Sequence, residues 1–379
     1  MTRDEFMSAA KDVIYLAACM VNGEKPDADR IHGMDLTALY RVSERHLLTG
    51  IVGYALEEAG VHDPDFIQAK SKAIRKVLLF SAENAAVLQK LEGAGIWYMP
   101  LKGSVLKDCY PKAGMRQMAD CDILIDGSRA DDVKAVMEGL GFSSKHFGTG
   151  THDCYYKEPV YNFEIHRELF GTAHADNLRE YYRDVKDRLL KDENNRYVYH
   201  FSQEDFYIYM VAHEYKHFSG SGTGLRSLLD VYVFLKKNSP SLDFGYIEAE
   251  VKKLGLDAFE RQNRSLAKHL FGNERLTEDE EKMLEYIICS GTYGTVTHHV
   301  ENSVQKLGGG TKGKVRYLFR RAFLPMESIR SAYPFIYRHK ILTPFFHIYR
   351  LGKGLLFRQK RIRVELNSLN KNNRQKDKS

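Results

Sequence analysis

Two aspartates separated by one residue begin a predicted strand near the middle of the 379-residue chain. Asp120 and Asp122 lie in the run ADCDILID, and side chains two apart on a strand point to the same face of a sheet. Cys121 and the isoleucines that follow then point to the other, buried face. Two carboxylates on one face of a rigid strand suit a hard cation such as Mg²⁺. The spacing therefore predicts a metal site at Asp120 and Asp122.

A glycine turn precedes this pair in the chain. Lys102-Gly103-Ser104 ends a predicted first strand, residues 96–101, and opens a short helix. A glycine at such a junction lets backbone N–H groups approach a phosphate, and the helix N-terminus favours its charge. Lys102 and Arg116 flank the aspartates and could neutralise a triphosphate, or could be an exposed lysine and a structural ion pair. A phosphate turn beside an acidic pair indicates nucleotide chemistry.

A third carboxylate lies on a later strand, where residues 160–169 alternate cleanly between apolar and polar side chains. One predicted face carries Tyr161, Phe163 and Ile165, and the other carries Asn162, Glu164 and His166. Glu164 thus lies on the polar face of a half-buried strand. Carboxylates on neighbouring strands could hold two Mg²⁺ ions that bridge nucleotide phosphates and activate a hydroxyl.

Three runs of the chain carry a resemblance to a known family. LKGSVL, MRQMADCDILI and FEIH resemble the uncharacterised nucleotidyltransferase family of the DNA polymerase beta superfamily, which is similar in its core to the aminoglycoside and lincosamide nucleotidyltransferases. The resemblance covers residues 91–166 closely and the helices around residues 216–217 and 225–235 more loosely. It implies a nucleoside triphosphate substrate and two Mg²⁺ ions.

The resemblance also implies a role for each matching residue. Gly103 and Ser104 would hold the β- and γ-phosphates, and Asp120 and Asp122 would bind the metals. Glu164 would bind the catalytic metal and act as the general base for the acceptor. Ser104 stands where the family pattern has a second glycine, and Glu164 is a looser match than an aspartate.

Two further positions lie on predicted helices beyond this core. The resemblance implies that Lys216 faces the nucleotide, whereas Arg226 and Asp230, one turn apart, are predicted to form a structural ion pair. The implied reaction transfers a nucleoside monophosphate from a triphosphate such as ATP to a hydroxyl or phosphate acceptor and releases pyrophosphate. The sequence leaves the acceptor and the choice of nucleotide open.

A competing motif occupies residues 213–217, where HEYKH matches H-E-x-x-H on a predicted helix. His213 and His217 share a face and could bind Zn²⁺, with Glu214 as the base of a hydrolase or peptidase. Thr223 stands where an extended form of the motif has its next ligand. Zinc-dependent hydrolysis is therefore a second hypothesis. A third is a catalytically degenerate nucleotide-binding protein, or a toxin-like protein that acts on tRNA or protein.

The segment Gly308–Val315, GGGTKGKV, nearly matches the phosphate-binding pattern G-x-x-x-x-G-K-[ST]. Val315 lacks the hydroxyl that would bind Mg²⁺, and the residues before the glycines do not resemble a buried strand. We therefore predict a flexible linker here.

The pattern as a whole predicts an α+β fold, with a small mixed nucleotidyltransferase sheet, flanking helices, and helical N- and C-terminal regions. We predict four regions, which are a helical region, a nucleotidyltransferase core, a second helical region and a basic aromatic tail. They span residues 1–75, 76–172, 173–305 and 306–379.

The distribution of charge separates the tail from the body. Residues 312–379 carry eighteen Lys and Arg against three acids, a balance of +15, so the rest of the chain carries −9 of the net +6. Aromatic side chains among these cations could stack on nucleic acid, lie on an anionic surface or pack on the body. The five unpatterned cysteines, the absence of a signal-like start and the lack of a long apolar run predict a cytoplasmic protein without a transmembrane segment.

Overall fold

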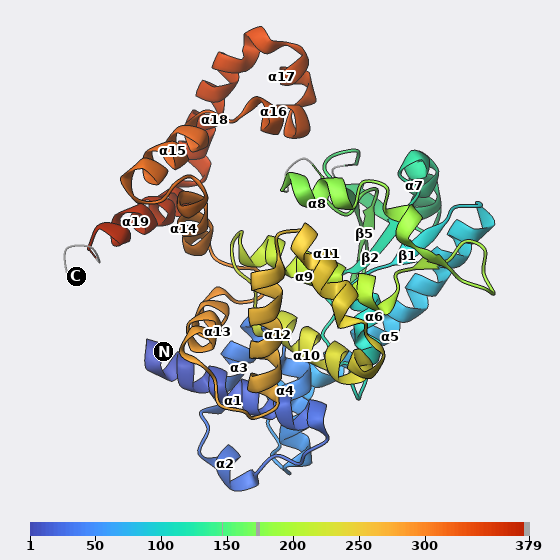
Figure 1. Ribbon diagram of the computed structural model, residues 1–379, viewed down its shortest axis with the longest axis vertical. Coiled ribbons are helices and arrows are strands. Elements are labelled where there is room, and N and C mark those ends of the chain that lie inside the picture. Colours follow the sequence, from blue (N-terminus) through green and yellow to red (C-terminus); the bar gives the residue numbers. More distant parts are fainter. Residues whose placement is uncertain (146, 172–174, 375–379) are drawn as a thin grey trace.

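The computed structural model describes residues 1–145, 147–171 and 175–374, and the predicted α+β class is confirmed (Figure 1). The N-terminal part is helical, as predicted. Asp35 caps the third helix by accepting hydrogen bonds from the backbone N–H groups of Thr37 and Ala38 at 2.9 and 3.0 Å. The fifth helix runs through residue 75 without interruption. The helices are α1 (Arg3–Asn22), α2 (Ala28–His32), α3 (Leu36–Arg45), α4 (Thr49–Glu58) and α5 (Pro64–Gly93).

A five-stranded mixed sheet follows, with the strand order β1-β2-β5-β4-β3. Strand β2 runs antiparallel to β1 and parallel to β5, and the remaining pairs are antiparallel. Pro100 ends the edge strand β1, as its missing N–H predicts. The strands are β1 (Tyr98–Pro100), β2 (Cys121–Ile125), β3 (Ser143–Lys145), β4 (His152–Lys157) and β5 (Tyr161–His166). The short helix α6 (Gly103–Leu106) and α7 (Ala130–Gly139) lie between strands.

The two faces of the sheet have different roles. One face is apolar and packs against α5 and α7, through a cluster that includes Phe80, Val87, Val133 and Met137 from the helices and Cys121, Ile123, Ile125 and Phe163 from the strands. Leu124, which points the other way, belongs to a separate and larger core. The predicted alternation along β2 is therefore confirmed, and it leaves the aspartates on the face away from α5 and α7.

A second helical region covers that other face. Its helices are α8 (Asp176–Tyr181), α9 (Gln203–Phe218), α10 (Leu225–Asn238), α11 (Phe244–Lys253), α12 (Asp257–Phe271) and α13 (Glu278–Ser290). The expectation of purely helical structure here was wrong, because β6 (Leu190–Lys191) and β7 (Tyr199–His200) form a hairpin. Its turn is held by Asp192, whose carboxylate accepts hydrogen bonds from the N–H groups of Asn194 and Asn195. The predicted boundary at residues 172–173 lies outside the described residues.

The C-terminal helices extend away from the rest of the molecule (Figure 1). They are α14 (Val296–Lys306), α15 (Gly310–Ala322), α16 (Met326–Ala332), α17 (Pro334–Arg338), α18 (Thr343–Phe357) and α19 (Gln359–Arg374). Within the described ranges, none of the helices has the length and apolar character needed to cross a membrane.

The predicted linker at residues 308–315 is wrong, since α15 already begins at Gly310. Gly308, Gly309 and Gly310 have positive φ angles of 104°, 65° and 52°, so they form a tight reversal. A side chain at Gly313 would meet the carbonyl oxygen of Val304 at 2.4 Å, so this glycine lets α15 pack closely on α14. The three consecutive glycines thus allow a tight turn, and Gly313 allows the close contact between α15 and α14.

One glycine also positions the loop that leads into the aspartates. A Cβ at Gly50 on α4 would lie 2.3 Å from the carbonyl oxygen of Gly114, whereas a Cβ at Gly93 on α5 would meet nothing within 4 Å. We expect Gly50→Ala to destabilise the fold by about 1–3 kcal/mol through overpacking. Gly93→Ala, the matched control, should be neutral or stabilising by up to about 1 kcal/mol. Urea denaturation monitored by circular dichroism measures both, and equal midpoints would contradict this packing.

Candidate active site

Parallel pairing of β2 and β5 brings two of the predicted carboxylates side by side. Asp122 is in register with Glu164, and oxygen or nitrogen atoms of Asp122, Glu164 and His166 all lie within 4.8 Å of one another. Asp120 directly precedes β2 and lines the same pocket of about 370 Å³. The structure thus gathers the three predicted carboxylates in one cavity.

The carboxylate of Asp122 is buried and held by two partners. Lys102 Nζ lies 2.6 Å from Asp122 Oδ1, and His166 Nε2 lies 2.8 Å from the same oxygen. Burial alone would raise the pKa of Asp122, but the charge of Lys102 and the hydrogen bond from His166 outweigh it and hold that pKa well below its usual range. Asp122 is therefore ionised, and no described residue donates to its second oxygen.

His166 is an uncharged partner. Burial lowers the pKa of His166 to about 4, so the ring is neutral near pH 7 and donates from Nε2 to Asp122. Its Nδ1 is buried and has no hydrogen-bond partner among the described residues. The sequence placed His166 on the polar face of its strand without assigning it a role. Its position two residues after Glu164 was the available signal.

The other two carboxylates are less well compensated. Burial and the charge of Asp122 raise the pKa of Asp120, which receives no hydrogen bond or ion pair from a described residue. Burial, together with the charges of Asp122 and Asp120, raises the pKa of Glu164 to about 7. The nearby cations offset this repulsion only in part. Closely spaced carboxylates in this state fit a divalent metal, which prefers oxygen ligands and would relieve their repulsion.

The turn after β1 differs in detail from the expectation. Lys102, and not Gly103, adopts a positive φ angle, of 42°. Gly103 leaves room for the buried Arg116, because a Cβ at position 103 would lie 2.6 Å from Arg116 Nη1 and that side chain would have to shift. The hydroxyl of Ser104 lies 3.3 Å from the sulfur of Cys121, on the opposite side of β2 from the aspartates, and Ser104 does not line the pocket. Of the predicted site residues, the structure brings together all but Ser104.

Arg116 has the partner that was predicted for Arg226. Its Nε and Nη2 donate to the two carboxylate oxygens of Asp230 at 2.8 and 2.9 Å, and the hydroxyl of Tyr110 donates to Asp230 at 2.7 Å. The predicted Arg226–Asp230 pair is therefore wrong, because Asp230 already has a buried bidentate partner. Arg226 instead donates to the carbonyl of Gln117 at 3.1 Å and lines the pocket together with Lys102, Arg116 and Lys216.

Helix α9 supplies the wall opposite the sheet. Tyr209, His213 and Lys216 lie one turn apart along α9 and line the pocket, as does Tyr293 from the loop after α13. Burial and the charge of Lys102 lower the pKa of Lys216 to about 8, although Asp122 and Glu164 oppose this. Lys216 therefore lies in the same pocket as the three carboxylates.

The H-E-x-x-H motif has an incomplete metal geometry. His213 and His217 approach within 3.3 Å through their Nε2 atoms. Glu214 accepts a hydrogen bond from Asn263 on α12 at 2.8 Å. Among the described residues, neither histidine belongs to a group of three possible metal ligands. The helix geometry therefore favours a packing role for Glu214.

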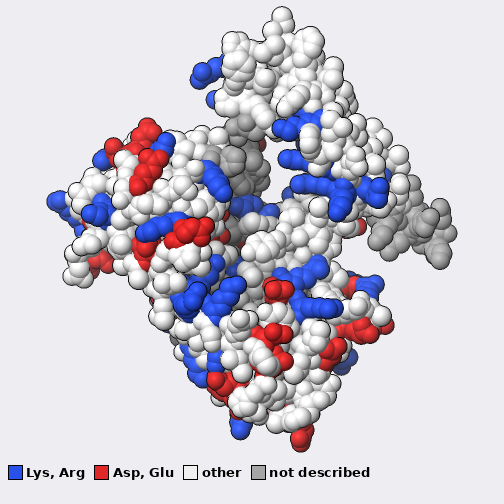
Figure 2. Space-filling view, turned by 180° about the vertical axis from the view of Figure 1, so that it is seen from behind, with Lys and Arg blue, Asp and Glu red and all other residues white. Residues whose placement is uncertain are grey.

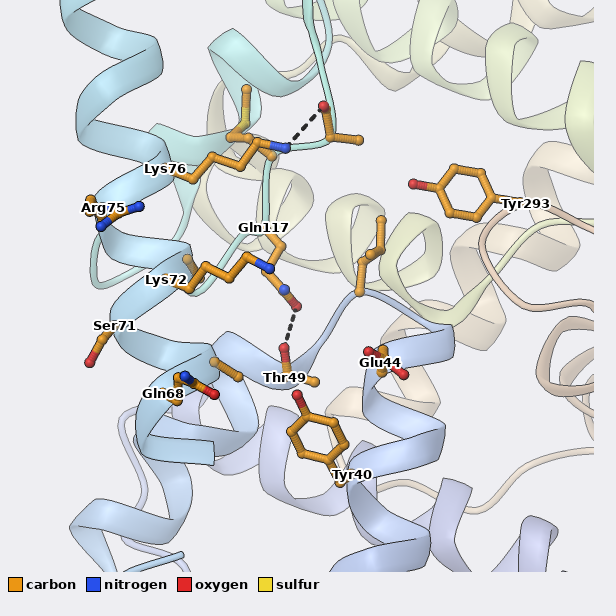
Figure 3. Close-up of a pocket in the computed structure, with 15 residues that line it drawn as sticks. Tyr40, Glu44, Thr49, Gln68, Ser71, Lys72, Arg75, Lys76, Gln117 and Tyr293 are labelled. Atoms are coloured by element: carbon orange, nitrogen blue, oxygen red, sulfur yellow. Dashed lines mark hydrogen bonds between the residues drawn. The ribbon is translucent and has the colours of Figure 1, made fainter. Parts of the chain in front are cut away.

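A larger cavity, of about 700 Å³, adjoins the pocket and shares Ala119 and Tyr293 with it. Figure 3 shows Lys72 and Lys76 projecting from α5 toward Gln117, with Tyr293 facing them from the opposite side. Lys76 donates to the carbonyl of Ala119 at 3.2 Å. Neither lysine forms an ion pair with a described carboxylate. Lys72, Arg75 and Lys76 line the cavity with one carboxylate, Glu44, so the cavity carries net positive charge beside Ala119, the neighbour of Asp120.

Comparison with known families places this geometry in context. A family model of uncharacterised nucleotidyltransferases matches residues 32–272. The chain belongs to this family, and the matched region contains every predicted site residue. We found no match to the chain among curated proteins or among solved structures.

The burial of Glu214 allows a test of whether this residue of the H-E-x-x-H motif has a packing role. Burial raises the pKa of Glu214 to about 7, so its ionisation destabilises the fold as pH rises from the unfolded pKa of 4.5 to the folded value. We expect Glu214→Gln to stabilise the fold by up to about 3 kcal/mol at pH 8 and by much less at pH 5. Denaturant titrations at both pH values measure this, and destabilisation at pH 8 would contradict it.

Proposed function

We propose that this protein is a Mg²⁺-dependent nucleotidyltransferase that transfers a nucleoside monophosphate from a nucleoside triphosphate to a hydroxyl or phosphate acceptor. The observation that carries the proposal is the register of Asp122 with Glu164, beside Asp120, in a pocket rich in cations. Membership of the nucleotidyltransferase family supports it.

Asp120, Asp122 and Glu164 would hold two Mg²⁺ ions, which when bound would neutralise the triphosphate and lower the pKa of the attacking hydroxyl. The acceptor oxygen forms a bond to the α-phosphorus while the bond from that phosphorus to pyrophosphate breaks. Glu164 takes the proton of a hydroxyl acceptor and so acts as the general base.

The cations of the pocket have complementary tasks. Lys102, Lys216 and Arg226 line it together with the carboxylates and are placed to bind phosphate oxygens and stabilise the leaving pyrophosphate. Lys102 bonds Asp122 in this structure, so binding of metal and nucleotide would shift its ammonium from the carboxylate to a phosphate.

In this proposal the adjoining cavity binds the acceptor. Lys72 and Lys76 lie one turn apart on α5 and face the same space, where their like charges favour an anionic ligand. Tyr40 and Tyr293 provide flat apolar surfaces in the same cavity. These features fit a small acceptor that carries a phosphate or carboxylate group.

Asp120 offers the cleanest test of the reaction. Because it makes no hydrogen bond or ion pair with a described residue, Asp120→Asn removes a metal ligand without breaking a structural contact. We expect transfer of label from α-³²P nucleoside triphosphates to components of a cell extract to fall by at least about 10³-fold. The control Asp131→Asn, on the exposed side of α7, should keep full activity.

The melting temperature of Asp120→Asn should equal or exceed that of the native protein, because the substitution removes a charge repelled by Asp122. Native-level transfer by Asp120→Asn, with the label still Mg²⁺-dependent, would contradict the assignment.

The acceptor cavity has its own test. In the same label-transfer assay, the acceptor is supplied as the fraction of the cell extract that takes up label. Lys72→Met/Lys76→Met should raise the KM for this acceptor by about tenfold or more, since two charge-assisted contacts are lost. The KM for the triphosphate should change less than about twofold. Lys90→Met, exposed farther along α5, is the matched control. A raised KM for the triphosphate alone would place these lysines at the nucleotide instead.

A further inference from the structure

The C-terminal helices present an unusual amount of apolar surface. Helix α18 and the segment before it contain large side chains that are mostly exposed, up to 82% for Ile341 and 78% for Phe357. The exposed apolar residues from α17 onward to the end of α18 are Phe335, Ile341, Leu342, Phe345, Ile348, Tyr349, Leu351, Leu355, Leu356 and Phe357. Soluble surfaces rarely expose so large a contiguous apolar patch unless it binds something.

Helix α18 is exposed around most of its circumference. His347 is the one buried side chain among its described residues, and exposed residues stand at successive positions such as Tyr349 and Leu351. Helix α18 also carries Arg350 and Lys353, so it combines a broad exposed apolar surface with cationic positions. So broad an apolar surface is normally covered by protein or lipid. At fifteen residues, it is about 22 Å long, shorter than a bilayer core. It can therefore be covered by lying in an interface but not by spanning it.

Positive charge surrounds this apolar segment. The sequence from Ser328 to Val364 contains nine Lys and Arg and no acid. The nearest following acid, Glu365, is already paired with Arg321 and Arg361 at 3.0 and 3.1 Å. Residues 296–374 form a C-terminal lobe, whose stem is the part nearer the body and whose tip is its outer end. Figure 2 shows basic side chains gathered along the stem, whereas the tip is largely uncharged. The lobe thus combines an apolar tip with a basic stem.

We propose that the C-terminal lobe, residues 296–374, docks this enzyme on an anionic lipid membrane surface. In this arrangement α17 and α18 insert their apolar side chains at the level of the acyl-chain boundary, and the Lys and Arg of the stem contact the phosphate headgroups. Apolar burial and attraction to anionic lipid together give stable interfacial binding, where either alone is weak.

The composition of the tip distinguishes lipid from other occupants. Aromatic rings suffice for stacking on nucleic acid, but six of the ten exposed apolar side chains are aliphatic, among them Ile341, Ile348 and Leu356, and these gain nothing from bases. A second copy of the chain would bring two strongly basic lobes together, and their repulsion opposes that contact. An acidic membrane satisfies both the apolar and the charged parts of the lobe.

Co-sedimentation of the full chain with vesicles tests the proposal. The chain should bind vesicles of 70% phosphatidylcholine and 30% phosphatidylglycerol at 0.15 M NaCl, bind less as salt rises, and remain in the supernatant with pure phosphatidylcholine. Phe345→Asn/Ile348→Asn should weaken binding by about tenfold or more, because both side chains are 70% exposed and their loss leaves the fold intact.

The matched control is Ile67→Asn/Leu78→Asn, which removes exposed apolar side chains from α5 and should bind vesicles like the native protein. Equal loss in the control, or absence of binding to acidic vesicles, would overturn the proposal. So would binding to poly(A) RNA that vesicles do not compete, or a dimer in sedimentation equilibrium that hides the tip. Label transfer in solution should be unchanged in Phe345→Asn/Ile348→Asn, so this test is independent of the proposed reaction.

Discussion

The buried charge of Asp122 constrains most of the site. An ionised carboxylate in the interior of a protein costs several kcal/mol unless it is paired and hydrogen-bonded. The fold therefore has to hold the partners of Asp122 in place as well as Asp122 itself. Lys102 comes from the end of β1 and His166 from the end of β5, and both contact the same oxygen on β2. These two contacts therefore hold the turn before α6, the acidic strand and the strand of Glu164 in a single arrangement.

The surrounding charges are balanced only in part. The charge of Asp122 is compensated, whereas burial, and then repulsion by neighbouring carboxylates, raise the pKa values of Asp120 and Glu164. Lys216 and Arg226 have lowered pKa values for the corresponding reason. A pocket in which both signs of charge are partly uncompensated is suited to bind a metal–triphosphate complex, which carries both signs itself.

The sequence predicted those features of the structure that depend on residues close together in the chain. Alternation of period two predicted the two faces of β2, since strand geometry alone decides it. The partner of Asp230 could not be predicted, because Arg116 lies 114 residues away and the neighbouring Arg226 satisfied the rule for helix pairs. Three consecutive glycines at 308–310 fit a linker and a tight turn equally well. The orientation of Ser104 toward Cys121 likewise depends on how α6 packs on the sheet.

The proposed metal centre consists of Asp120 directly before β2, Asp122 on β2 and Glu164 on β5. Anomalous diffraction from crystals grown with Mn²⁺ and a non-hydrolysable nucleoside triphosphate measures the metal positions directly. We expect Mn²⁺ to be bound by Asp120, Asp122 and Glu164, with the triphosphate beside Lys102. Metal bound instead between His213 and His217, with no density at the carboxylates, would contradict it.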